Sequence, residues 1–110
     1  MADYIRSMPI REDEPLESEE KSQTIGSVST LITFSQDVMG IEIANNSNDA
    51  TIYLNISGGV VSLTTGIPIY AKGYYAADKK IKQAIGVSLI SNKPNTDVRI
   101  IGHYHLEAEE

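Results

Sequence analysis

The chain of 110 residues contains no cysteine, which excludes disulfides and thiolate metal sites. Tryptophan is also absent and phenylalanine occurs once, so six tyrosines supply nearly all of the aromatic content. No apolar run approaches the roughly 20 residues that a membrane-spanning helix requires. The opening residues carry too many charges for a secretory signal. These absences predict a chain that is made without export and has no membrane partner.

Acidic residues outnumber basic ones, and the excess lies at the two ends of the chain. Residues 1–24 carry seven acidic and three basic side chains, a net charge of −4, and residues 107–110 add three acidic ones. Residues 25–106 carry five acidic and six basic side chains, a net charge of +1. A nucleic-acid footprint needs a clustered excess of Lys and Arg, so this distribution argues against nucleic acid as a partner.

The middle of the chain shows the strongest secondary-structure pattern. Apolar residues alternate with polar ones in Ile41–Ile43 and again in Ile52–Ile56, which is the period of a half-buried strand. The Asn45–Asp49 run between them favours a turn, and a Gly-Gly pair precedes Val60–Leu63. The sequence therefore predicts an antiparallel meander of three strands.

Further strand signals flank this region. Ile25–Phe34 is rich in β-branched residues, and Ile69–Ala77 is a strand or an extended loop. Gly86–Ser91 and Thr96–Leu106 are predicted to form a closing hairpin, whose last strand slips at Ile101-Gly102. About seven or eight short strands with regularly spaced turns predict an all-β fold. We expect an antiparallel β-sandwich or small barrel with an extended N-terminal arm.

The predicted domain boundaries follow the composition. Residues 1–24 are an acidic arm too polar to form a core, residues 25–106 are the β-sandwich domain, and residues 107–110 are an acidic tail. The arm is either a disordered leader or a segment that becomes ordered against a partner, and a short helix from Glu14 to Lys21 is an alternative. Its candidate partner-binding residues are the apolar ones: Tyr4, Ile5, Met8, Ile10 and Leu16.

Two further clusters are candidates for partner binding. Tyr70, Tyr74 and Tyr75 make up half of the tyrosines. Tyrosines pack in cores and also at interfaces, and packing is the favoured interpretation. Lys79, Lys80 and Lys82 form the one cationic cluster in the sequence. These lysines either protect an exposed strand edge, the favoured interpretation, or dock to an acidic surface such as the arm of another copy.

No pattern in the sequence predicts catalysis. His103 and His105 share one face of a predicted strand and could begin a zinc site, but no third ligand is marked, so polar surface is the favoured interpretation. The Asn45–Asp49 turn lacks the spacing of a calcium loop. Motifs for a Ser-His-Asp triad and for a phosphate-binding glycine loop are absent. We therefore expect no catalytic residue, no metal, no cofactor and no enzymatic activity.

The pattern of turns and strands in residues 40–104 resembles that of small β-sandwich virion proteins of tailed bacteriophages, of the capsid decoration or cement type. The resemblance rests on an Asn-rich turn before an IYL strand, a Thr-Gly-Ile-Pro-Ile segment and a terminal T-x-V-R-I strand. The matching residues are Asn45, Asn46, Ile52, Tyr53, Leu54, Gly66, Ile67, Pro68, Thr96, Val98, Arg99 and Ile100. The KGYYAADKKIKQ segment departs from the pattern, which usually has a shorter Gly-containing loop there.

This resemblance implies a structural virion protein that binds and stabilises the major capsid lattice. The implied partners are the major capsid protein and further copies of the chain, in a homo-oligomer that by analogy is a trimer. The implied location is the capsid surface of the virion, after synthesis in the host cytoplasm. We expect Tyr70–Lys82 at or near the subunit contact, with the arm reaching beyond its own subunit.

Two alternatives to capsid decoration remain. One is a head-tail connector, tail or fibre-base subunit, which is also a structural virion protein. The other belongs to a different class: a β-sandwich that uses its tyrosines to bind a small ligand or carbohydrate.

Overall fold

A computed structural model describes residues 16–105, which consist of eight β-strands and their connections. The strands are β1 (Leu16–Ile25), β2 (Thr30–Ile32), β3 (Gly40–Asn45), β4 (Ile52–Asn55), β5 (Ile67–Ile69), β6 (Tyr74–Ala77), β7 (Val87–Ser91) and β8 (Thr96–His105). Residues 16–105 contain no helix, so this part of the chain has no helix long and apolar enough to span a membrane.

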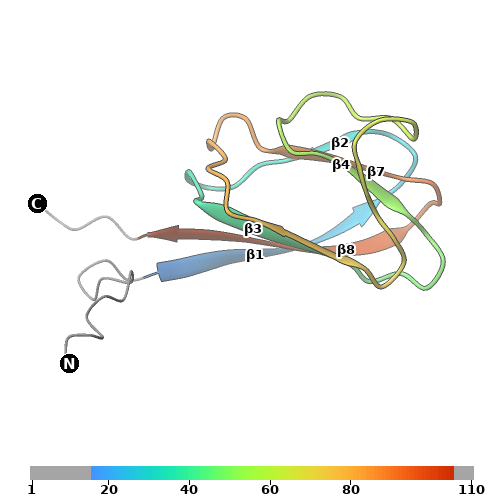
Figure 1. Cartoon of the computed structure of the whole chain (residues 1–110), viewed down its shortest axis with the longest axis horizontal. Helices are drawn as coiled ribbons and strands as arrows, with labels where there is room; N and C mark the ends of the chain where they lie inside the picture. The colour runs from blue at the N-terminus through green and yellow to red at the C-terminus, as the bar shows by residue number, and fades with distance from the viewer. Residues whose placement is uncertain (1–15, 106–110) are drawn as a thin grey trace, which may run out of the picture.

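The pairing of the strands defines the fold. β1 pairs with β8, β2 with β7, β3 with β6 and β4 with β5, all antiparallel, as in one long folded hairpin. Additional pairing of β3 with β8 and of β4 with β7 completes two four-stranded sheets. Their strand orders are β1-β8-β3-β6, called sheet A, and β2-β7-β4-β5, called sheet B. The two sheets form the layers of an eight-stranded jelly roll (Figure 1), which confirms the predicted all-β sandwich.

The hydrophobic core lies between the two sheets. In β3 the buried aliphatic residues are Ile41 and Ile43, and in β4 they are Ile52 and Leu54, so each strand turns alternate side chains inward. The other members of the core are Ile25, Ile32, Phe34, Val38, Ile69, Ile81, Val87, Leu89, Val98 and Ile100. Full burial of one such aliphatic side chain stabilises the fold by about 1.5–3 kcal/mol. Aliphatic packing is therefore the main stabilising term.

β8 runs through Gly102 without the slip that the sequence predicts. Gly102 occupies an inward position, where a Cβ atom would lie 2.8 Å from the ring of Phe34 and 2.9 Å from Val38. Glycine thus takes the place of an inward apolar residue, because the two neighbouring side chains fill the space above it. The predicted slip is wrong for this reason.

β1 corrects the predicted boundary between arm and domain. Its residues pair with β8 over the whole length, from Leu16 opposite His105 to Ile25 opposite Thr96. Residues 16–24 therefore belong to sheet A, and residues 16–21 form a strand rather than part of a helix.

The composition does not predict β1 because this strand lies at the edge of the sheet, where its inward side chains before Ile25 are polar. Glu19, for example, accepts hydrogen bonds from the backbone N–H and the hydroxyl of Ser35, at 3.0 and 2.9 Å. Residues 1–15 and 106–110, including the predicted acidic tail, lie outside the described part of the chain.

Two predicted hairpins are in fact connections between the sheets. β3 lies in sheet A and β4 in sheet B, while β7 lies in sheet B and β8 in sheet A. The third strand of the predicted meander, Val60–Leu63, is part of the loop between β4 and β5. The predicted meander and closing hairpin are therefore wrong. Local alternation locates strands, but it does not identify the strand with which each one pairs.

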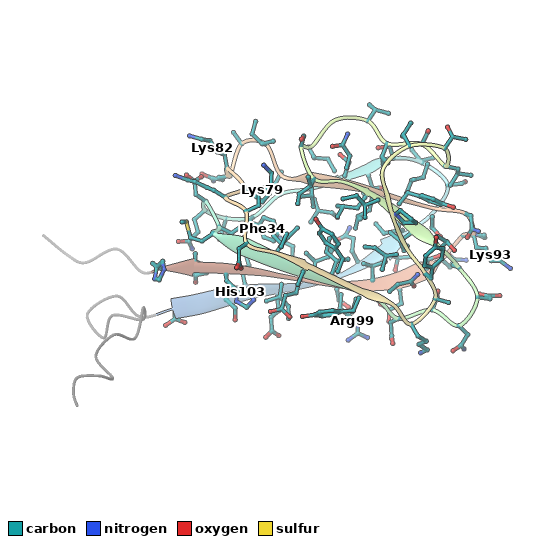
Figure 2. The ribbon with its side chains drawn as sticks, in the orientation of Figure 1. Phe34, Lys79, Lys82, Lys93, Arg99 and His103 are labelled. Atoms are coloured by element: carbon teal, nitrogen blue, oxygen red, sulfur yellow. The ribbon has the colours of Figure 1, made fainter. Side chains whose placement is uncertain are left out.

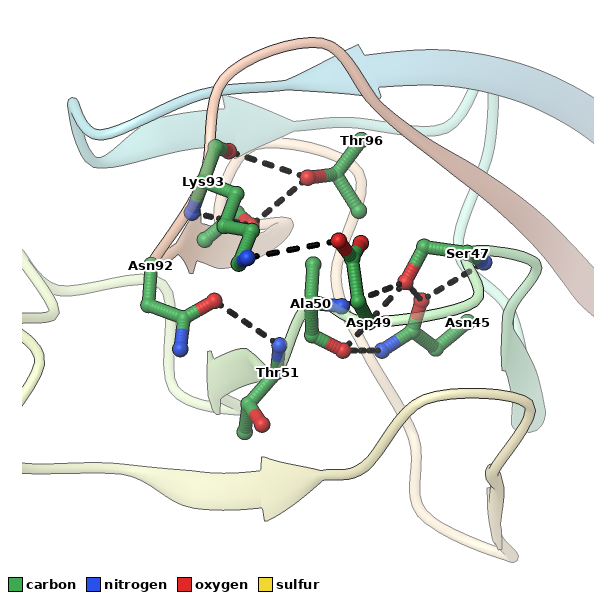
Figure 3. Close-up of polar contacts among 9 residues, drawn as sticks. Asn45, Ser47, Asp49, Ala50, Thr51, Asn92, Lys93 and Thr96 are labelled. Carbon is green, nitrogen blue, oxygen red and sulfur yellow. Dashed lines mark hydrogen bonds and ion pairs between the residues drawn. The ribbon is translucent and has the colours of Figure 1, made fainter.

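Asn45 fixes the connection between β3 and β4 (Figure 3). Its side chain is buried, and Nδ2 donates hydrogen bonds to the carbonyl oxygens of Ala50, at 2.8 Å, and Ile69, at 2.9 Å. Its Oδ1 accepts hydrogen bonds from the N–H and the hydroxyl of Ser47, at 3.0 and 2.7 Å. These contacts use the hydrogen-bonding capacity of the Asn45 side chain, so this residue holds the turn.

Candidate functional site

The residues predicted to bind a partner fall in separate places. Tyr4, Ile5, Met8 and Ile10 lie outside the described residues. Leu16 begins β1, with its backbone opposite His105. The tyrosine and lysine clusters lie toward opposite ends of β6, because Tyr70 precedes this strand and Lys79–Lys82 follows it. The expectation that Tyr70–Lys82 lies at a subunit contact stays a prediction.

Lys79, Lys80 and Lys82 surround a buried anchor, Ile81. The backbone of Ile81 exchanges two hydrogen bonds with Val38, at 2.9 and 3.0 Å, and its side chain is in the core. The three lysines are exposed, and Figure 2 shows Lys79 and Lys82 at the same end of the sandwich. They lie between β6, an edge strand of sheet A, and β7, and Ile81 among them forms an isolated antiparallel bridge with Val38. Their predicted role in protecting an exposed strand edge stays a prediction. Residues 79–82 are called the lysine loop.

A depression lies at the same end of the molecule. It is lined by Gln36, Asp37, Met39, Lys80, Gln83 and His105. The backbone N–H of Gln83 donates a hydrogen bond to Oδ1 of Asp37 at 2.8 Å, which ties the lysine loop to the connection before β3. His105, at the end of β8, pairs with Leu16, at the start of β1. The described chain therefore begins and ends beside the lysine loop.

The three clustered tyrosines have different surroundings. Tyr70 lies between β5 and β6 and is 66% exposed, and Tyr74 is 62% exposed on the outer face of sheet A. Tyr75 is partly buried and packs against the core. Tyr75 thus fits the packing interpretation, whereas Tyr70 and Tyr74 are accessible to a partner.

Glu42 connects three neighbouring strands on the outer face of sheet A. It accepts a hydrogen bond from the hydroxyl of Tyr74 on β6, and its other carboxylate oxygen accepts one from Nε2 of His103 on β8, at 2.6 Å. These hydrogen bonds, first that of Tyr74 and then that of His103, hold the pKa of Glu42 below its usual value. The hydrogen bond to Glu42 raises the pKa of the Tyr74 hydroxyl.

Sequence reasoning did not find this bridge. In the sequence, Glu42 is only the polar residue between two isoleucines. The one available signal was the outward position of both Glu42 and His103 in alternating segments. The contact itself depends on the register that places Glu42 opposite Ala76 and Ile101, two residues from Tyr74 and from His103.

A second polar cluster lies further along the same face. Asp97 accepts hydrogen bonds from Arg99, at 3.0 and 3.2 Å, and from Nδ2 of Asn46, at 2.8 Å. The hydrogen bonds from Arg99 and then from Asn46 lower the pKa of Asp97, and the same Arg99–Asp97 contact raises the pKa of Arg99. Lys72 donates to the carbonyl oxygen of Asn46 at 3.2 Å. Sheet A therefore presents paired polar groups to solvent.

Within residues 16–105, no group of three or more His, Cys, Asp or Glu side chains is placed to hold a metal ion. His103 directs Nε2 at Glu42, which is a single carboxylate partner. The expected lack of metal, cofactor and catalysis stays a prediction.

Comparisons with known proteins do not identify a family. No protein-family model matches the chain, and no curated protein matches it. A solved structure of a Bacillus endospore appendage, from a family of disulfide-linked pili, shows a distant likeness. The alignment covers 86% of this chain and 91% of that one, at 15% sequence identity and a TM-score of 0.45. A likeness at this level carries no conclusion about function.

Proposed function

We propose that this chain is a structural virion protein that decorates the major capsid lattice of a tailed phage as a homo-oligomer. In this proposal the jelly roll is a rigid body that sits on the lattice. The segments outside it reach onto neighbouring subunits and add contact area. A head-tail connector, tail or fibre-base subunit would use the same physical design with a different partner.

One observation carries the proposal: the described part of the chain begins and ends at the end of the sandwich that carries the lysine loop. Leu16 and His105 are paired there, and His105 lines the same depression as Lys80. The 15 residues before Leu16 span at most about 50 Å when extended, which is enough to reach an adjacent subunit. Their acidic side chains suit a basic patch on a capsid, and the lysine loop suits the acidic arm of a neighbouring copy.

The fold is compatible with capsid decoration but does not identify this function. Eight-stranded jelly rolls recur in viral capsid proteins and also in lectins and other binding proteins. Fold alone therefore does not decide among these functions. Capsid decoration, unlike the other functions, is proposed to use charged contacts at the end of the sandwich, and this difference can be tested.

Co-sedimentation with purified capsids tests the proposal. The test variant carries Lys79→Glu, Lys80→Glu and Lys82→Glu together. The matched control is Lys93→Glu, because Lys93 lies at the opposite end of the sandwich in Figure 2 and pairs with an exposed Asp49 at 3.3 Å. We expect the triple variant to bind at least about tenfold more weakly at low salt, and the control to bind as wild type does.

Salt separates a charged contact from a general loss of structure. The difference between the triple variant and wild type should shrink above physiological ionic strength, where the screening length falls below about 8 Å. Equal binding of both proteins at low salt would contradict the role of the lysine loop. Failure of wild type to bind any capsid would contradict the proposed function itself.

Ligand binding on the outer face of sheet A is a second candidate function. The observation that favours it is the exposed ring of Tyr74 beside the carboxylate of Glu42, near a shallow depression whose lining includes Glu20, Ser22 and Arg99. Carboxylates and an accessible aromatic ring are the groups by which a protein binds a polar ligand with an apolar face. Titration with oligosaccharides, followed by NMR, should then shift the resonances of Tyr74 and Ala76. Capsid binding without any such shift favours the first function.

A further inference from the structure

The two sheets differ in charge. The strands of sheet A carry seven charged side chains, which are Glu17, Glu19, Glu20, Lys21, Glu42, Asp97 and Arg99. The four strands of sheet B carry none, and neither do the adjoining residues 26–29, 56–66 and 83–86. The outer surface formed by sheet B and these three connections is called face B. It is an uncharged surface on a chain whose net charge is −6.

Face B also holds most of the exposed large apolar side chains in the described residues. Ile67, on β5, is 36% exposed. The five other exposed apolar residues of face B are Val60 at 87%, Val28 at 74%, Leu31 at 52%, Ile85 at 47% and Leu63 at 44%. Single exposed apolar residues are ordinary, but a contiguous group without charge marks a contact surface.

Printed contacts show that these residues are neighbours in space. The backbone N–H of Val61 donates to Oγ of Ser29 at 3.1 Å, which brings the loop that carries Val60 next to Val28. A Cβ atom on Gly58 would lie 2.7 Å from the carbonyl oxygen of Ile85, so the same loop also touches the segment before β7. Face B is therefore continuous from the start of β2 to the start of β7.

The loop 56–66 is held against the sheet. Val61 is only 2% exposed, although its neighbour Val60 is the most exposed of the large apolar residues. Ser88 and Ile90 point outward from β7, yet they are 2% and 7% exposed. β7 is thus buried on both sides, and Figure 1 shows the loop arching over the sheet B strands. The loop presents Val60 outward from a fixed position.

We propose that face B is the surface through which two copies of this chain associate as a symmetric dimer. The inference names the self-association surface of the proposed homo-oligomer and rests on that part of the proposed function. The acidic excess of the chain lies at its two ends, and face B lets two copies meet without placing any charge in the contact. A two-fold interface requires one self-complementary patch, and an uncharged apolar patch on both partners meets that requirement.

This arrangement separates two tasks on one small domain. Pairing through face B directs the charged faces of both sheet A layers outward, away from the contact. The lysine loop and the paired ends of β1 and β8 then remain available for the contacts made on the capsid lattice. Two other arrangements compete with this one: the predicted subunit contact around Tyr70, and the trimer that the resemblance implies. Each gives a result in the test below that differs from that of a dimer through face B.

Sedimentation equilibrium of the full chain measures the association directly. The test variants are Val60→Asp, in the fixed loop, and Leu31→Lys, on β2, because each adds a charge to an exposed position of face B. The matched control is Tyr70→Asp, since Tyr70 is 66% exposed but lies outside face B. Melting temperatures identify any variant that has lost its fold.

We expect wild type and Tyr70→Asp to form dimers with the same dissociation constant. Val60→Asp and Leu31→Lys should each raise that constant at least tenfold while melting as wild type does. If the wild-type dimer is weakened by neither face B variant, or only by Tyr70→Asp, the face B inference is overturned. The homo-oligomer itself would still stand in both cases. A monomeric wild type would overturn the homo-oligomer as well, and a trimer would overturn the two-fold pairing. Capsid binding, measured separately, tests the rest of the proposed function.

Discussion

The carboxylate of Glu42 on β3 lies 2.6 Å from Nε2 of His103 on β8, although 61 residues separate them in the chain. The second oxygen of Glu42 holds the hydroxyl of Tyr74 on β6. One carboxylate therefore links the outer strand β6 to the two inner strands of sheet A. This link should be visible in the stability of the protein and in its dependence on pH.

Glu42→Gln should lower the melting temperature at pH values above 4.5. The pKa of Glu42 in the fold lies below the ordinary value of 4.5, so its carboxylate stabilises the fold fully above that pH. The stabilisation is lost as pH falls through the folded pKa. The difference in melting temperature between wild type and Glu42→Gln should therefore shrink on acidification below pH 4.5. Thermal unfolding across pH, with exposed Glu20→Gln as the control, measures it, and a difference that grows in acid would contradict this account.

Gly102→Ala should destabilise the protein by overpacking. The new Cβ would meet the Phe34 ring at 2.8 Å and Val38 at 2.9 Å, inside the core. Overpacking of this kind costs about 1–3 kcal/mol. Gly26→Ala is the matched control, because no atom lies within 4 Å of its Cβ position. Urea denaturation of both variants provides the measurement, and equal stabilities would refute the close contact at Gly102.

Asn45→Ala should weaken the connection between the sheets. The substitution removes the 2.9 Å donor of the buried Ile69 carbonyl oxygen, and it leaves the Ala50 carbonyl oxygen with only the Ser47 hydroxyl at 3.3 Å. A buried group left unpaired costs about 1–3 kcal/mol. A loss of this size corresponds to several degrees of melting temperature in a domain of about 100 residues. Asn48→Ala, an exposed position in the same turn, should change little, and equal losses in the two variants would argue against the Asn45 network.

Two truncations test where the folded domain begins. Removal of residues 1–15 leaves β1 in place, so the melting temperature should stay within a few degrees of wild type. Removal of residues 1–24 deletes nine of the ten residues paired with β8 and exposes the edge of that strand. Each backbone hydrogen bond contributes about 0.5–1.5 kcal/mol, so this loss approaches the whole stability of a domain. A stable, folded 25–110 fragment would restore the boundary that the composition predicts.

Much of the strand content could be predicted, because alternation reflects burial directly. Ile41–Ile43 and Ile52–Ile56 include the inward residues of β3 and β4, and turn-forming residues mark the connections. β1 could not be predicted, because the inward side chains of residues 16–24 are polar and this edge strand therefore shows no apolar alternation. Gly102 was mistaken for an interruption because its inward position becomes intelligible only with Phe34 and Val38 above it.

The pairing of the strands could not be predicted from the local pattern. Hairpins are the usual interpretation of neighbouring strands, but this chain changes sheet at every connection except that between β4 and β5. Face B was missed for the same reason. The uncharged stretches that contain its residues, 22–36, 50–71 and 83–92, are visible in the sequence, yet only the sheet order brings the residues of face B to one side.

Saturation binding of the labelled full chain to purified capsids is the most direct test of the central claim, that this is a capsid-decorating protein. The account predicts binding that saturates at a fixed number of copies per capsid subunit, because each copy occupies one repeating position on the lattice. It also predicts that excess unlabelled chain displaces the label. No retention on capsids, or retention that rises without saturation, would contradict the claim.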